Sequence, residues 1–226
     1  MENTKEIAAM VVVQDVLIVI MAVHILSLLR KSFGFTKMHY PFYLVPIIGL
    51  AWGAVWSYAP FLVAQRLQPP PFGQAGAILL LVLASSAFWL SPYTKRKAAQ
   101  FDAAPLVWLC FWRCVFGMSV LGLGIAGGLP PEFYWSVAIG DMLVGLIGLA
   151  ILTQNGQPSR RTVATWNVLG LLDLSHVLVL GAITLRPFFG MNPEVPFVNL
   201  LPMTGVPLLL SLHVLGLRYG WRSVNI

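Results

Sequence analysis

The sequence predicts an all-α membrane protein, a bundle of seven transmembrane helices that forms a single domain. Hydrophobic residues make up 58% of the 226 residues and charged residues only 10%, whereas a soluble domain carries about 25% charged residues. The apolar residues fall into seven runs. Each run is close to the length of about 20 residues that a helix needs to cross a hydrocarbon core of about 30 Å.

Each apolar run is expected to form one membrane-spanning helix. The runs cover residues 8–29, 40–64, 74–90, 105–126, 133–152, 163–185 and 197–217. The first is expected to be a span, because it holds Asp15 and lacks the positively charged start and the small-residue cleavage site of a signal peptide. In the last run, Pro202 and Pro207 remove backbone donors and are expected to kink the helix.

The basic residues lie unevenly between the two sides of this predicted bundle. Ten of them fall in the first, third and fifth loops and the C-terminus, and three fall on the opposite side. Cytoplasmic loops collect Lys and Arg, so the N-terminus is expected outside and the C-terminus in the cytoplasm. This topology accounts for the net charge of +6, and a nucleic-acid partner is therefore not expected.

Three ionisable residues lie near the middle of three successive apolar runs. They are Arg113, Asp141 and Asp173, in the fourth, fifth and sixth runs. A charge at the centre of a bilayer costs at least about 2.5–3.5 kcal/mol, so it normally pairs, faces a cavity or serves a function. A guanidinium can bind two carboxylates, so we expect an Asp–Arg–Asp cluster. The cluster is either a structural ion-pair network or a site for a proton or small solute.

The sixth run also carries a polar stripe. Trp166, Gly170, Asp173 and Val177 recur at helical spacing, and Asn167 and His176 lie about 60° to either side of this stripe. The order of Asn167, Asp173 and His176 along the helix suits a hydrogen-bonded proton relay. Asn and His also join membrane helices by interhelical hydrogen bonds, and the sequence leaves both interpretations open.

Two histidines near the predicted cytoplasmic face suggest a cofactor. His24 in the first run and His213 in the seventh lie at a similar depth, and b-type haem in helical bundles is held between two imidazoles. A c-type haem attachment motif is absent from the sequence. Haem b is therefore one hypothesis for a cofactor, with His24 and His213 as its ligands.

Two segments carry a resemblance to other proteins. They are Gly-Asp-Met-Leu-Val-Gly at residues 140–145 and Trp-Asn-Val-Leu-Gly-Leu-Leu-Asp-Leu at residues 166–174, preceded by Arg113 and Leu129-Pro130. Together they resemble an uncharacterised family of small bacterial multi-helix membrane proteins, over about residues 105–215. The resemblance implies an integral protein of the bacterial cytoplasmic (inner) membrane, and it implies no activity.

Three functional hypotheses follow. The first is a membrane protein that binds or moves a proton or small solute at Arg113, Asp141, Asn167, Asp173 and His176. The second is a structural or accessory subunit that contacts other membrane subunits as well as the lipid bilayer. The third is a haem b electron-transfer subunit. Neither a serine-hydrolase nor a zinc-protease motif is present in the sequence, so an enzyme is not the expected class.

Overall fold

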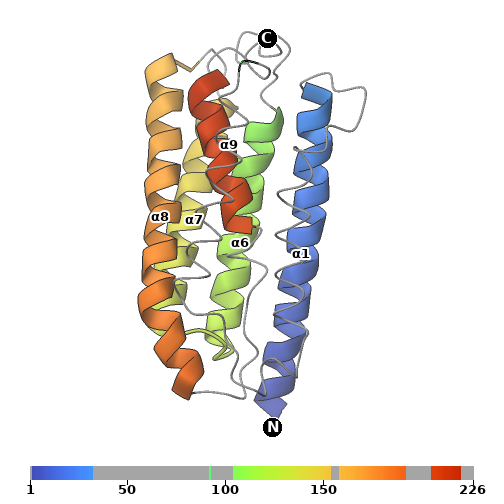
Figure 1. Cartoon of the computed structure of the whole chain (residues 1–226), viewed down its shortest axis with the longest axis vertical. Helices are drawn as coiled ribbons and strands as arrows, with labels where there is room; N and C mark the ends of the chain where they lie inside the picture. Colours follow the sequence, from blue (N-terminus) through green and yellow to red (C-terminus); the bar gives the residue numbers. More distant parts are fainter. Residues whose placement is uncertain (1, 33–91, 93–103, 154–157, 192–204, 220–226) are drawn as a thin grey trace.

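The structure is a computed structural model that describes residues 2–32, 92, 104–153, 158–191 and 205–219. Its helices lie side by side along the long axis of the molecule (Figure 1). The described residues form α1 (Glu2–Ser32), α6 (Ala104–Ile125), α7 (Pro131–Leu152), α8 (Arg160–Met191) and α9 (Val206–Tyr219). The all-α prediction is therefore confirmed for this part of the chain.

Four of these helices are long and apolar enough to cross a membrane. They are Lys5–Leu28, Pro105–Ile125, Pro131–Leu152 and Arg160–Leu185, and they correspond to the first, fourth, fifth and sixth predicted spans. The predicted spans at 40–64 and 74–90 lie outside the described residues. The predicted span at 197–217 is described only from residue 205 onward, where α9 forms a shorter apolar helix. The described structure thus supports four spans, and the total of seven stays a prediction.

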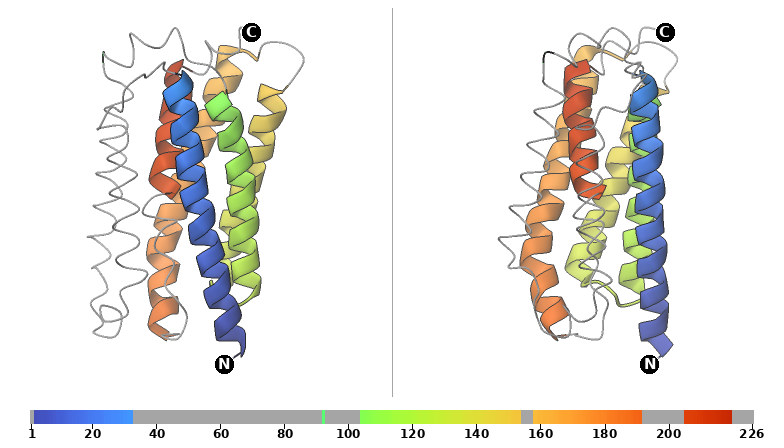
Figure 2. Two further views of the ribbon diagram at one scale, coloured as in Figure 1. Left: turned by 90° about the vertical axis from the view of Figure 1, so that its right-hand side faces the viewer. Right: turned by 45° about the vertical axis from the view of Figure 1, so that its right-hand side comes forward.

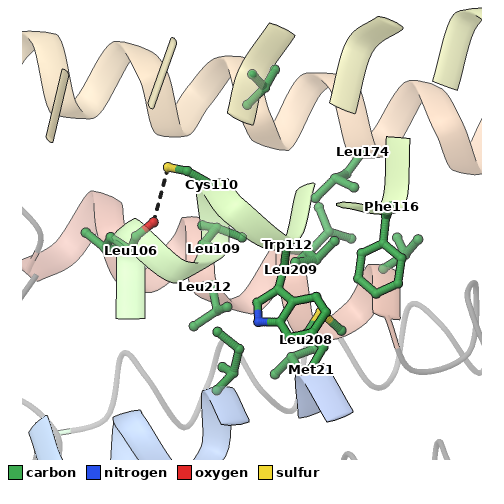
Figure 3. Close-up of a cluster of buried hydrophobic side chains, with 14 of the residues drawn as sticks. Met21, Leu106, Leu109, Cys110, Trp112, Phe116, Leu174, Leu208, Leu209 and Leu212 are labelled. Atoms are coloured by element: carbon green, nitrogen blue, oxygen red, sulfur yellow. Dashed lines mark hydrogen bonds between the residues drawn. The ribbon is translucent and has the colours of Figure 1, made fainter. Parts of the chain in front are cut away.

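Helix α6 is the central element of the described bundle. It contacts α1, α7 and α9, while α8 contacts α7 and α9 (Figure 2). Figure 3 shows how Trp112 of α6 lies among Leu208, Leu209 and Leu212 of α9 and Met21 of α1. Burial of apolar groups on three sides fixes the rotation of α6 about its axis.

A tight turn joins α6 to α7. Gly127 adopts the left-handed conformation, with φ 87°, and its N–H donates to the carbonyl of Gly124 while that of Gly128 donates to Leu123. These two bonds are the Schellman ending of a helix, in which glycine avoids the penalty for a side chain. Pro131 then takes the first position of α7, where its missing donor costs nothing. The two helices therefore run antiparallel and in contact.

The outward faces of the helices are apolar. On α8, Val168, Leu169, Leu172, Val179 and Ile183 are all exposed. A large exposed apolar surface marks a contact with lipid or with another protein. These faces are compatible with a lipid environment.

Candidate functional site

Arg113 is completely buried at the centre of the bundle. Its Nη2 atom lies 2.7 Å from Oδ1 of Asp141 on α7 and also contacts Oδ2 of Asp173 on α8. The structure thus contains the expected contact between Arg113 and the two acids. Both carboxylates meet the same guanidinium nitrogen, so they lie close to each other.

The other terminal nitrogen of Arg113 faces two further groups. Nη1 lies 3.5 Å from the carbonyl oxygen of Gly170 on α8 and 3.2 Å from Nε2 of His213 on α9. Arg113 therefore joins four helices, α6, α7, α8 and α9. His213 is itself fully buried. It belongs to the cluster, although the sequence suggested it only as a haem ligand.

Asn167 extends the cluster beyond His213. Its Oδ1 lies 3.1 Å from Nδ1 of His213, and its Nδ2 donates to the carbonyl of Val163 at 2.8 Å. The ring of Trp166 packs edge-on against His213 at 5.4 Å and donates its own N–H to the carbonyl of Val144. Asn167 and Trp166 are buried, so this end of the cluster is closed by packed side chains.

Three glycines leave the space that the polar side chains occupy. A Cβ atom at any of these positions would collide with the polar side chain of a neighbouring helix. Small residues let membrane helices approach closely, which brings polar groups on different helices within bonding distance. The pairs are Gly140 with Asp173, Gly170 with His213, and Gly216 with Asn167.

His176 does not join the cluster, contrary to the predicted stripe. It is exposed on α8, and among the described residues it makes no hydrogen bond or ion pair with the other predicted site residues. It follows Asp173 by three positions, so its side chain is rotated by about 60° and leaves the face that packs on α6 and α7. The spacing of residues along α8 did not by itself show whether His176 faces the cluster or the outside of the bundle.

The haem hypothesis does not fit the contacts of His213. Both of its ring nitrogens already have partners, Arg113 at Nε2 and Asn167 at Nδ1, so neither is free to bind iron. His24 instead lies beside Trp108 and Trp112 of α6, and Trp112 donates to its Nδ1 at 3.4 Å. In the described part of the chain, no group of three or more His, Cys, Asp or Glu residues is arranged to hold a metal ion.

With both aspartates ionised, the cluster has a net negative charge. Arg113 contributes one positive charge and the two ionised aspartates contribute two negative charges, which leaves one negative charge in an apolar interior. Asp141 Oδ1 touches Nη2 but makes no hydrogen bond among the described residues. The side chain of Asp173 is 16% exposed, whereas that of Arg113 is completely buried. The acidic part of the cluster is therefore the part that opens toward the surface.

In the part of the chain that the structure describes, the fold and the site define an all-helical protein with four helices long enough to span a membrane and a buried cluster of charges. Residues 70–219 match the model of a family described as a domain of unknown function (DUF8737). The match covers more than half of the chain, and the protein belongs to this family. This match agrees with the resemblance of residues 105–215 to an uncharacterised family. No curated protein and no solved structure matches the chain.

Proposed function

We propose that this protein is an integral membrane protein that binds a proton at the Asp141–Asp173 pair and couples its movement to transport. The full proposal has seven spans in a bacterial cytoplasmic membrane, with the N-terminus outside. The cluster then lies in the membrane interior, since Arg113 is about 14 Å along α6 from its Ala104 end at about 1.5 Å per residue.

The meeting of two carboxylates at one guanidinium nitrogen carries this proposal. Two carboxylates that share a site repel each other, and one bound proton removes the repulsion and supplies a hydrogen bond between them. That proton also cancels the remaining negative charge of the cluster. Asp173 is the more exposed of the two carboxyls, so in this proposal it is the group that exchanges the proton.

A static ion-pair brace is the principal rival, and it suits an accessory subunit. Buried charge networks can fix the register of helices without any other function. Removing Arg113 would strand buried charge under both interpretations, so it would not distinguish them. Removing a titratable carboxyl without changing its shape does distinguish them.

The first prediction concerns Asp141→Asn and Asp173→Asn. Each variant keeps the size of the side chain and removes its proton-binding group, so each should fold yet lose proton uptake in reconstituted vesicles. The infrared spectrum of the wild-type protein should show the carbonyl stretch of a protonated carboxylic acid. We expect one or both variants to remove this band.

Glu132→Gln is the matched control, because Glu132 is an exposed carboxyl in the first turn of the same helix as Asp141. It should keep both the band and proton uptake. The proposal is wrong if the wild-type protein shows no such band, or if both well-folded asparagine variants keep full activity. The accessory-subunit hypothesis would then be the better one.

A further inference from the structure

The hydrogen bonds of His213 determine its protonation state. Arg113 can only donate, so Nε2 of His213 must accept at 3.2 Å. A neutral imidazole then carries its proton on Nδ1, which faces Oδ1 of Asn167 at 3.1 Å. The amide of Asn167 is oriented the same way by its bond to the carbonyl of Val163. His213 is thus neutral, with its proton on Nδ1, whenever it contacts Arg113.

One proton can occupy either of two groups in the cluster, the Asp141–Asp173 carboxyl pair or His213. With the proton on the carboxyl pair, Arg113 balances the remaining carboxylate and His213 is neutral. With the proton on His213, two positive charges balance two carboxylates. The total is zero in both states, so neither state leaves a net charge in the apolar interior.

The described contacts of these two places are with Arg113 and with neutral groups. Arg113 on α6 is the charged side chain that contacts His213, while Asn167 and Trp166 on α8 are neutral. On the acidic side, the thiol of Cys114 lies near Asp141. The exchange therefore concerns the carboxyl pair, His213 and the guanidinium between them.

The two places lie at different depths along α8. His213 rests against Gly170 and bonds to Asn167, whereas Asp173 is farther from the Arg160 end of the helix. Gly170 and Asp173 are separated along the axis by about 4.5 Å at about 1.5 Å per residue. A proton that changes place within the cluster therefore moves along the bundle axis.

We propose that His213 is the second proton-binding group of this site and that Arg113 controls exchange between it and the carboxyl pair. This inference rests on the proposed proton-binding function. A proton on Nε2 would face the donors of Nη1, so His213 can bind it only after Arg113 withdraws. Loss of the proton by the carboxyl pair supplies a second negative charge, which draws the guanidinium away from His213.

The exchange is balanced and involves no redox change. The O–H bond of the protonated carboxyl breaks and leaves a carboxylate, and an N–H bond forms at Nε2 and converts imidazole to imidazolium. Release of the Nε2 proton restores the neutral imidazole with its proton on Nδ1, and uptake of another proton at Asp173 restores the protonated carboxyl pair, so the site returns to its first state.

The second prediction is that His213→Gln removes proton flux but keeps the fold and the protonated carboxyl. Glutamine retains an acceptor for Arg113 and a donor for Asn167 but does not titrate. Flux in reconstituted vesicles should fall by about 100-fold or more, since a positioned proton-transfer group contributes about 10²–10⁴-fold. The infrared carboxylic acid band should remain. His24→Gln is the control, because His24 lies on α1 and contacts Trp112 rather than the cluster.

Nitrogen-15 NMR of histidine-labelled wild-type protein provides a test that needs no variant to fold. The His213 signal should show a protonated Nδ1 and an unprotonated Nε2. The opposite tautomer, or His213→Gln with normal flux and an intact carboxyl band, would overturn this inference and leave the proposed function standing. Absence of the carboxyl band from the wild type would instead overturn the proposed function.

Discussion

At the scale of single residues, Gly140 determines whether Asp173 can reach Arg113. A Cβ at residue 140 would collide with the carboxylate of Asp173, which Arg113 holds in place. Gly140→Ala should therefore displace this carboxylate and destabilise the protein by about 1–3 kcal/mol, the usual cost of overpacking. Thermal unfolding in detergent measures the change.

Gly122→Ala is the matched control for this third prediction. Gly122 is also inside a helix, but its Cβ would meet only the terminal methyl of Met10, at 3.1 Å. That flexible side chain can move aside, and alanine favours a helix over glycine by about 0.5–1 kcal/mol. Equal effects of the two substitutions would show that Asp173 is not held where the structure places it.

The sequence predicted the charged residues at the centre of the site, but it did not predict every residue that belongs to the site. Arg113, Asp141 and Asp173 stood out because a charge inside an apolar run has few alternatives to a charged partner. The choice between His176 and His213 needed the rotation of α8 and the packing of α9, which spacing within one helix does not contain. Gly216, one turn after His213, meets Asn167 only once α8 and α9 are packed together.

At the scale of elements, the helix ends follow capping more closely than hydropathy. α8 begins at Arg160, before the predicted start at residue 163, because Ser159 accepts a hydrogen bond from the N–H of Thr162. It continues to Met191, past the apolar run and through Pro187. Hydropathy identifies the part of a helix that suits lipid, whereas the backbone hydrogen bonds of α8 continue beyond that part at both ends.

The fourth prediction tests the turn between α6 and α7. Gly127→Ala places a side chain at a φ of 87° and should destabilise the protein by about 1 kcal/mol. Gly127→Asn should cost less, because asparagine tolerates the left-handed region better than other residues with side chains. Thermal unfolding of both variants gives the comparison. If alanine were no worse than asparagine, the turn would not have the Schellman geometry.

At the scale of the whole molecule, the antiparallel helices bring distant basic residues to one end of the bundle. Arg30 and Lys31 end α1, Arg160 begins α8 and Arg218 lies in the last turn of α9, and these helix ends lie together (Figure 1). The charge pattern of the sequence predicted this grouping. The relative placement of α1, α6 and α9 could not be predicted, because it depends on side-chain packing around Trp112.

The fifth prediction concerns how this bundle lies in the membrane. The basic end should be cytoplasmic, because Lys and Arg are retained on that side. Glu132 is exposed in the first turn of α7 and Ser159 is exposed immediately before α8, and Ser159→Cys and Glu132→Cys can each be introduced with Cys110→Ala and Cys114→Ala. An impermeant thiol reagent should label residue 132 from outside in intact cells and residue 159 only after the cytoplasmic face is exposed.

Each other outcome of this labelling has a distinct structural meaning. Labelling of both positions from one side would show that α7 does not cross the membrane, and the cluster would then not lie in its interior. The reverse pattern would keep the crossing but invert the bundle, so Asp173 would face the cytoplasmic side of Arg113. Proton uptake would then be expected from the cytoplasm and release through His213 to the outside. The orientation therefore determines the direction in which this site can move a proton.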